Sequence, residues 1–284
     1  MNKPRIVLFA LVSLIIIVAC ALPGGPANPT SEPAPTVDTE LLQVMVNRTV
    51  TAAIAETEQA APTPEVEKEE IQATETPLPT EAAADPSSSL TSQADGTILF
   101  VDDQAKFQLN VSPGWLPLRI DQQEYYDAFS LPAASAPAVQ RALMNIKTLD
   151  PQTFRLFIYD LQDGHLINGV ITSVNFVWDP EASISLENDA AIKQAADDLA
   201  VSIPNLNIDS YSVSTTAGNI PIGVILSNIP GKTFEGTDVV LFQKQIYLNL
   251  PAGSLVVSFT TEQSFKDATL PFFDTMIDSM KINS

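Results

Sequence analysis

The chain contains very little of the two side chains that most often carry chemistry. Cys20 is its only cysteine and His165 its only histidine among 284 residues. No disulfide can form within one chain, a Cys–His pair is excluded if Cys20 is modified, and a Ser-His-Asp triad has one possible centre. The folded part must therefore be stable without covalent links, which a domain of about 190 residues achieves by burying enough surface.

Basic residues are also scarce. The sequence has 14 Lys and Arg against 34 Asp and Glu, and its formal net charge is −20. A nucleic-acid partner is disfavoured, because binding to phosphate backbones needs clustered Lys and Arg. A large net charge keeps a protein soluble, and we expect a monomeric body.

Aromatic residues are missing from a long segment near the N-terminus. Residues 21–96 contain no Phe, Tyr or Trp and ten prolines, whereas every aromatic residue except Phe9 lies beyond residue 97. Such a composition cannot bury enough apolar surface to offset the entropy of ordering. The sequence therefore predicts three parts, namely a signal peptide at 1–19, a mostly disordered tether at 20–96 and a folded domain at 97–284.

One stretch of the tether, residues 38–58, lacks Gly and Pro and places apolar residues at helical spacing. It could be a self-association helix, a site lying on the membrane surface, or a transient helix without a role.

The N-terminal residues have the order of a secretory signal peptide. Lys3 and Arg5 precede an apolar run that ends at Cys20. Residues 17–20, Ile-Val-Ala-Cys, resemble a bacterial lipobox, which implies cleavage before Cys20 and attachment of diacylglyceryl and fatty acyl groups such as palmitate. An uncleaved transmembrane helix is the alternative, but the run is at the lower length limit and no basic stop-transfer residues follow it. We expect a lipid-anchored protein on the extracytoplasmic face of the cell membrane.

The folded domain alternates strand and helix patterns separated by turns. Expected strands lie at 98–101, 106–111, 115–121, 154–160, 166–178, 208–216, 220–227, 239–250 and 255–261, and expected helices at 122–129, 136–149, 186–203 and 265–280. The last helix should bury a stripe of Phe265, Ala268, Phe272, Met276 and Met280. Most connections are too short for parallel crossovers, so the expected fold class is α+β, a mainly antiparallel sheet with packed helices.

Three stretches of this domain, residues 107–115, 218–224 and 273–282, resemble the PsbP-like fold, which includes PsbP and the Ran-binding Mog proteins. The resemblance implies a PsbP-like sandwich over residues 97–284. It also implies binding or assembly rather than catalysis, and no functional residue is carried over from it.

Most candidate catalytic or ligating groups have structural explanations. Asp160, Asp163 and His165 could supply three metal ligands, but they are also residues that a hairpin turn favours, and we expect a turn. Asp102-Asp103 is expected at a turn, and Asp197-Asp198 on the polar face of a helix. We expect no catalytic residue, no metal and no cofactor.

Two further motifs have structural explanations as well. Gly231-Lys232-Thr233 lacks the first glycine of a phosphate-binding loop and is expected in a hairpin turn. Trp115 and Trp178 are expected to pack in the core.

The candidate partner surface is Tyr125 and Tyr126, followed by the small-residue loop 131–137. Adjacent tyrosines and loops on a rigid sheet are both common at interfaces. The hypothesis with most support is a non-catalytic binding or assembly module for an envelope protein or a small ligand. The alternatives are an exported hydrolase that uses two carboxylates, or a purely structural surface lipoprotein.

Overall fold

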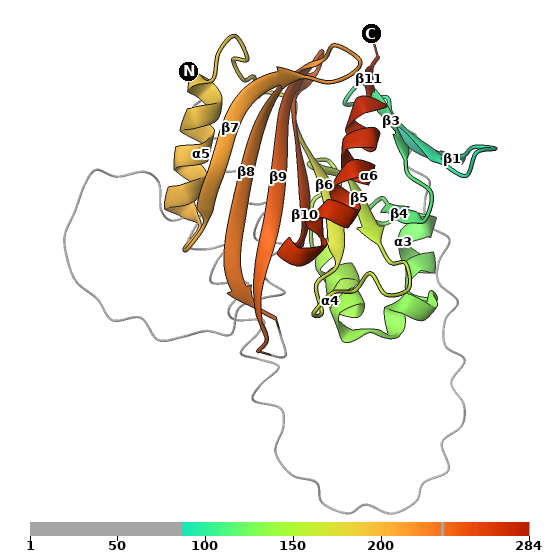
Figure 1. Ribbon diagram of the computed structural model, residues 1–284. Helices are drawn as coiled ribbons and strands as arrows, with labels where there is room; N and C mark the ends of the chain where they lie inside the picture. The colour runs from blue at the N-terminus through green and yellow to red at the C-terminus, as the bar shows by residue number, and fades with distance from the viewer. Residues whose placement is uncertain (1–86, 234–235, 284) are drawn as a thin grey trace, which may run out of the picture. The chain divides into compact units, whose positions relative to one another are not determined.

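The computed structural model describes residues 87–233 and 236–283 (Figure 1). The expected signal peptide, Cys20, the helix at 38–58 and nearly all of the expected tether lie outside the described residues. Within the described part of the chain, no helix is both long enough and apolar enough to cross a membrane.

Two antiparallel sheets form the frame of the domain. The small sheet has the order β1-β2-β3-β11, and the large sheet has the order β4-β5-β6-β10-β9-β8-β7. The small sheet comprises β1 (Ser88–Ser92), β2 (Ile98–Asp102), β3 (Phe107–Val111) and β11 (Lys281–Ile282). The large sheet comprises β4 (Trp115–Leu118), β5 (Phe154–Asp160), β6 (Thr172–Asp179), β7 (Asn207–Thr215), β8 (Pro221–Lys232), β9 (Asp238–Leu250) and β10 (Gly253–Glu262). Together with the helices, these sheets confirm the α+β fold class expected from the sequence.

The helices pack on both faces of the large sheet. They are α3 (Gln123–Ala128), α4 (Pro137–Ile146), α5 (Ala190–Ser202) and α6 (Lys266–Asp278), with 3₁₀ turns η1 (Pro132–Ser135) and η2 (Gln263–Phe265). On one face, α6 and the small sheet enclose a central core with residues of β5, β6, β9 and β10. On the other face, called here the outer face, α5 lies beside β7, and α3 and α4 lie near β4 and β5 (Figure 1).

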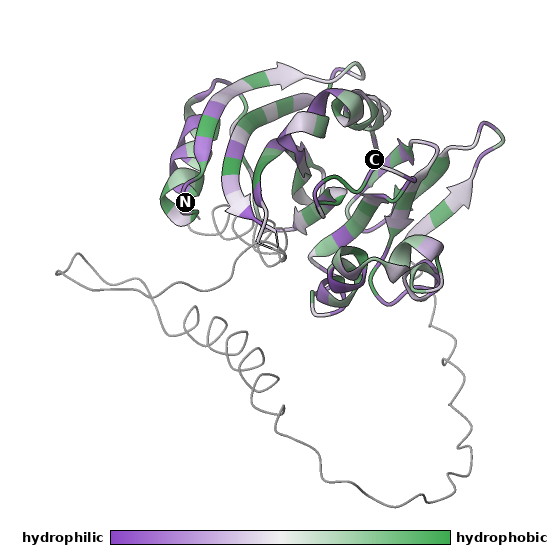
Figure 2. Ribbon diagram, turned by 60° about the horizontal axis from the view of Figure 1, so that its bottom comes forward, coloured by the Kyte–Doolittle hydropathy of each residue, from purple (hydrophilic) through white to green (hydrophobic). Residues whose placement is uncertain are grey.

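Strand periodicity explains how one sheet contributes side chains to the cores on both of its faces. Hydrophobic and hydrophilic residues alternate along the long strands (Figure 2). In β10, Leu255, Val257 and Phe259 belong to the central core, whereas Val256 belongs to the cluster under α5. Alternation with a period of two directs successive side chains to opposite faces. Close packing of α5 on β8 also requires a glycine, because a Cβ at Gly223 would lie 2.0 Å from Ile192 Cδ1.

Regular structure begins earlier than the sequence indicated. Strand β1 lies upstream of residue 97 and pairs with β2 over Ser88–Ser92. Its sequence is Ser-Ser-Leu-Thr-Ser, which has one apolar residue and no aromatic residue. Composition therefore assigned it to the tether, although backbone pairing and side-chain contacts hold it on the small sheet.

The connection between β5 and β6 is longer than expected. Residues 161–171 form a loop with one isolated bridge, Ile167 to Val170, so the expected strand at 166–178 begins only at Thr172. Residues 230–232 belong to β8, and the hairpin turn follows them.

The buried face of α6 also differs from the expected stripe. Helix α6 buries Thr269, Phe273, Met276 and Ile277, whereas Phe272 is 44% exposed. The ring of Phe273 stacks on Phe259 of β10 with centroids 5.1 Å apart. Met276 and Met280 are buried as expected, whereas Ala268 and Phe272 are exposed.

Candidate functional site

A block of uncharged polar side chains lies in the middle of the outer face. It lies between the apolar cluster under α5 and the apolar cluster under α3 and α4, which adjoin beside it at the paired residues Val256 and Val177. We call it the polar block, and it consists of Ser173 and Asn175 of β6, Ser258 and Thr260 of β10, Gln243 and Gln245 of β9, and Ser227 of β8. An apolar core is thus interrupted where four central strands run side by side.

Strand register arranges the polar block in two adjacent rows. The first row aligns Asn175, Ser258 and Gln245 on neighbouring strands. The second row aligns Ser173, Thr260, Gln243 and Ser227. Because partners on one face of an antiparallel pair lie about 5 Å apart, these side chains are direct neighbours.

Most of the block is buried, and several of its atoms have no partner. Asn175 is 2% exposed, and Gln243, Gln245 and Ser258 are fully buried. Among the described residues, Asn175 Oδ1, Gln243 Oε1, Gln245 Nε2, Ser258 Oγ and Ser227 Oγ are buried without a hydrogen-bond partner. A buried polar group without a partner costs about 1–3 kcal/mol, and native proteins contain few of them. Five such atoms therefore lie close together in the polar block.

The hydrogen bonds within the polar block determine which of its donors and acceptors have no partner. The Tyr247 hydroxyl donates to Gln245 Oε1 at 2.7 Å. Burial raises the pKa of Tyr247 above its ordinary value, so the phenol stays a neutral donor. The Gln245 amide nitrogen is left as a donor. Gln243 Nε2 donates to Thr260 Oγ1 at 3.4 Å, which leaves the Gln243 carbonyl as an acceptor.

A cavity of about 70 Å³ lies above one end of the polar block. Its floor includes Ser173, Asn175 and Thr260, and its walls are Ala138, Ala142, Phe157, Tyr159, Gly169, Val170, Ile171, Thr233, Val239 and Leu241. By the measure in which one water needs about 10–15 Å³, it has room for several waters or one small molecule. None of its lining residues is charged.

Local sequence explains why this space exists. Helix α4 faces the cavity with the small side chains Ala138 and Ala142, while larger residues such as Leu143 and Ile146 fill the neighbouring core. The long β5–β6 loop supplies Gly169, whose φ of 76° is in the left-handed region that favours glycine. Small residues on the helix and a bent loop at the rim together keep the floor uncovered.

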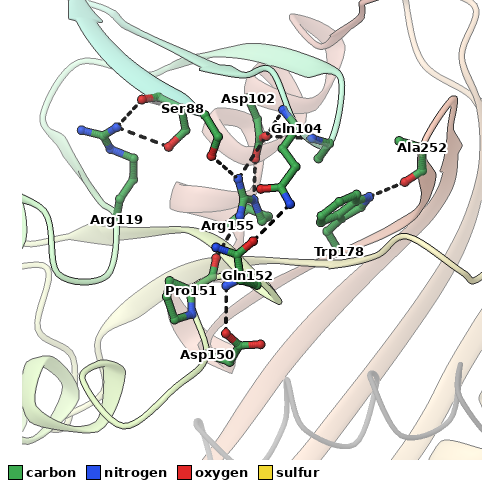
Figure 3. Close-up of polar contacts among 12 residues, drawn as sticks. Ser88, Asp102, Gln104, Arg119, Asp150, Pro151, Gln152, Arg155, Trp178 and Ala252 are labelled. Carbon is green, nitrogen blue, oxygen red and sulfur yellow. Dashed lines mark hydrogen bonds and ion pairs between the residues drawn. The ribbon is translucent and has the colours of Figure 1, made fainter. Parts of the chain in front are cut away.

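A second buried polar cluster lies on the opposite side of the large sheet, and its charged groups are paired (Figure 3). Arg155 of β5 donates to both carboxylate oxygens of Asp102 of β2, at 2.7 and 3.2 Å. It also donates to the Pro151 carbonyl and to Ser87 Oγ. Asp102 Oδ1 accepts from the backbone N–H groups of Gln104 and Ala105. This cluster, called here the arginine hub, ties the two sheets together.

The sequence placed Asp102 at a turn but did not predict its burial. Asp102 and Arg155 are 0% and 4% exposed. The register of β5 shifts between Phe154 and Leu156, and such a bulge re-aims the side chain between them. Asp197 behaves as expected, because it is exposed and paired with Lys193 one turn away.

His165 is held by neighbours rather than standing free at a turn. Its Nδ1 lies 2.7 Å from Asp160 Oδ2, and its ring meets Phe265 edge to face at 5.0 Å. Asp160 is 2% exposed and also accepts from Gln162. The expected turn is present and exposed at Asp163-Gly164, and the His165 N–H donates to the Gln162 carbonyl at 3.0 Å, but the imidazole contacts Asp160 instead of standing free. The described residues contain no group of three His, Cys, Asp or Glu side chains placed to hold a metal.

The two tyrosines of the expected partner surface have different environments. Tyr125 is 1% exposed, and its hydroxyl donates to the Leu143 carbonyl at 3.0 Å. Burial, with a smaller effect from the nearby Asp121 carboxylate, raises the pKa of Tyr125 to about 12. Tyr125 is thus a core residue, and the expectation that it faces a partner is wrong. Tyr126 is partly exposed beside Asp121, and its role stays a prediction.

The two tryptophans pack in the core, as expected. Trp115 and Trp178 are 3% and 5% exposed. The Trp178 indole N–H donates to the Ala252 carbonyl at 2.6 Å, and the Arg155 guanidinium lies 5.6 Å from the ring (Figure 3).

Sequence reasoning missed the polar block, although a signal was present. Polar residues occupy alternate positions in β6, β9 and β10, namely 173 and 175, 243 and 245, and 258 and 260. This alternation is also typical of a solvated sheet face. The block becomes visible only when strand order places the three pairs side by side.

No family model matches the chain, and no curated protein matches it. Among solved structures, it is similar to cyanobacterial PsbP (CyanoP) from Synechocystis sp. PCC 6803, with 9% identity, 70% of this chain and 94% of that chain covered, and a TM-score of 0.38. It is also similar to LpqN of Mycobacterium tuberculosis, described as involved in cell envelope biogenesis, with 10% identity, 69% and 91% covered, and a TM-score of 0.36.

A third similar structure is PA94 from Pseudomonas aeruginosa, a protein of unknown function, with 11% identity, 40% of this chain and 74% of that chain covered, and a TM-score of 0.32. Identities and scores this low carry no information on activity.

Proposed function

We propose that this protein is a membrane-tethered, non-catalytic binding module on the extracytoplasmic side of the membrane. In this proposal, lipid on Cys20 anchors the chain, the Pro-rich segment spaces the body from the membrane, and the body binds a small ligand in the cavity beside α4. The observation that carries it is Asn175, whose buried Oδ1 has no partner among the described residues and which lines that cavity.

The lining of the cavity supports the binding hypothesis and gives no support to the hydrolase alternative. A carboxylate-based hydrolase needs two acidic side chains facing one substrate. The cavity lining supplies hydroxyl, amide and apolar groups instead. Small-molecule sites are typically concave and mostly apolar with a few placed polar groups, and this cavity has those properties.

The ligand-binding part of the proposal is tested by filling the cavity. Ala142→Leu adds an apolar side chain that occupies the space, whereas Met144→Leu changes a residue of the same helix that is 54% exposed. Full-length protein in detergent is screened by ligand-observed NMR against small neutral and charged molecules. We expect at least one molecule to bind wild type and Met144→Leu but not Ala142→Leu. Absence of any binding, or equal binding to all three proteins, would contradict the proposal.

The anchoring part of the proposal is tested separately at Cys20. We expect Cys20→Ser to abolish acylation and processing, because the thiol is the group that a lipobox presents for modification. Cells are labelled with a fatty acid, and the mass of the protein is compared with wild type. A Ser variant that still incorporates label, or a wild type that incorporates none, would refute the anchor.

A further inference from the structure

The side chains around the cavity also restrict the chemical class of its ligand. We infer that the site selects a neutral group that both donates and accepts hydrogen bonds, either a carboxamide or a pair of hydroxyls, attached to a short apolar segment. This inference rests on the proposed binding function and adds the identity of the ligand class to it.

The neutrality of the ligand follows from the absence of charge around the cavity. The thirteen lining residues include no Asp, Glu, Lys, Arg or His. The rest of the polar block, Gln243, Gln245, Ser258 and Ser227, is uncharged as well. An ion moved from water into such a site loses hydration without gaining a counter-charge, and that cost is several kcal/mol even after relaxation. A neutral polar group has a much smaller desolvation cost.

The need for both a donor and an acceptor on the ligand follows from the floor. Asn175 places a side-chain amide in the lining, and an amide accepts hydrogen bonds at its oxygen and donates them at its nitrogen. Thr260 Oγ1 accepts from Gln243 and has its own O–H left to donate, so the ligand must accept there. Ser173 is the register partner of Thr260 and lies two residues from Asn175 on the same face. A carboxamide or two adjacent hydroxyls matches this arrangement.

The walls and the volume determine the remainder of the ligand. Phe157, Val239 and Leu241 give the cavity apolar sides, which favour a short hydrocarbon segment next to the polar group. A volume of about 70 Å³ corresponds to roughly five to seven water-sized atoms by the measure that assigns about 10–15 Å³ to one water. The bound portion is therefore a small molecule or one end of a larger one.

A series of probes with one shape and three charges tests this inference. Propionamide, propionate and propionamidinium have the same heavy-atom framework and are neutral, negative and positive. Propane-1,2-diol represents the hydroxyl class. Affinities for full-length wild type, Asn175→Leu and Ala142→Leu are measured by NMR titration. We expect propionamide or the diol to bind wild type at least tenfold more tightly than either ion, and to lose at least tenfold in Asn175→Leu.

The outcomes distinguish failure of the inferred ligand class from failure of the proposed function. If an ion binds as well as the neutral probes and Ala142→Leu blocks it, the inferred ligand class is wrong and the binding function stands. If neutral probes bind Asn175→Leu as tightly as wild type, the assigned polar contact is wrong. If no probe displaces the solvent and Ala142→Leu changes nothing, the cavity holds water only, and both the inference and the proposed function fail.

Discussion

The arginine hub and the polar block are both buried and polar, but they differ in whether their atoms are paired. In the hub, both oxygens of Asp102 accept hydrogen bonds, and Arg155 donates to three residues. In the block, five buried atoms have no partner among the described residues. The hub connects the two sheets, whereas the block lies beside a cavity.

This difference assigns a structural role to the arginine hub and leaves the polar block with groups that can bind water or a ligand. A buried polar network that is fully satisfied rigidifies a fold, whereas an unsatisfied one lowers stability until water or a ligand pairs with it. The hub should therefore lose stability when either member is removed. The block should lose little stability, or gain some, when a member becomes apolar.

The largest effect is expected for Asp102→Ala. Removing the carboxylate leaves the buried Arg155 guanidinium without its ion-pair partner, which typically costs about 3–5 kcal/mol. Urea unfolding should show this loss, while Asp103→Ala, at the exposed neighbouring position, should stay within about 0.5 kcal/mol. The double variant Asp102→Leu/Arg155→Met should recover part of the loss. A loss below about 1 kcal/mol in Asp102→Ala would mean that the pair is not essential.

A smaller loss is expected when the start of the body is moved from residue 87 to residue 97. The shorter chain lacks β1, the Ser87 hydroxyl bonded to Arg155, and the Ser88 carbonyl that accepts from Arg119 at 2.6 Å. Hydrogen bonds to charged groups contribute up to about 1.5–3 kcal/mol each, but both of these bonds are only partly buried and water can replace part of each, so we expect a total loss of about 2–3 kcal/mol. Thermal and urea unfolding of 87–284 and 97–284 give the comparison. Equal stability would show that β1 belongs to the tether after all.

Much of the fold was predictable because it depends on local patterns. Alternation in 239–250 and 255–261 predicted β9 and β10, and Pro137 at a first-turn position predicted the start of α4. Those signals lie within a few residues of each other. Strand β1 was missed because a single apolar residue in Ser88–Ser92 carries almost no pattern, and its pairing partner lies outside the segment.

The candidate site was not predictable for a related reason. Asn175, Ser258 and Gln245 come from three strands, and adjacency arises only from the sheet order β6-β10-β9. Tyr125 was misplaced because two adjacent tyrosines on a short helix must point different ways, and composition cannot say which one faces the core. The strand order of the sheet, and not a local sequence motif, brings the polar groups of the site together.

His165 is intermediate between the arginine hub and the polar block, because its partly exposed side chain is paired with a buried carboxylate. Its side chain is 33% exposed, and it contacts a buried Asp160 oxygen. A histidine standing free at an exposed turn would change the free energy of unfolding by no more than about 0.5 kcal/mol on mutation to Ala, whereas the contact with Asp160 raises the expected loss for His165→Ala to about 1–2 kcal/mol. Asp163→Ala, in the same loop but with an exposed side chain, should stay within about 0.5 kcal/mol. Urea unfolding of both variants decides, and equal small effects would show that the contact between His165 and Asp160 contributes little to stability.

The smallest effect, and the only one of opposite sign, is expected for Asn175→Leu. The substitution keeps the approximate volume and removes an acceptor that has no partner among the described residues, so the desolvation cost of that acceptor disappears. We expect the unfolding free energy to rise by about 1 kcal/mol or to stay unchanged.

Asn249→Leu is the matched control for this prediction. It makes the same substitution on β9, where the side chain donates to the Ile184 carbonyl at 2.7 Å and accepts from the Ile184 N–H at 3.0 Å. Loss of both bonds leaves backbone groups unpaired, and we expect a destabilisation of about 1–3 kcal/mol. Opposite signs for one substitution at two asparagines of the same sheet would establish that pairing, rather than polarity, distinguishes the polar block. If Asn175→Leu destabilises the protein as much as Asn249→Leu, the Asn175 amide is already satisfied, and the polar block does not differ in pairing from other polar residues of the sheet.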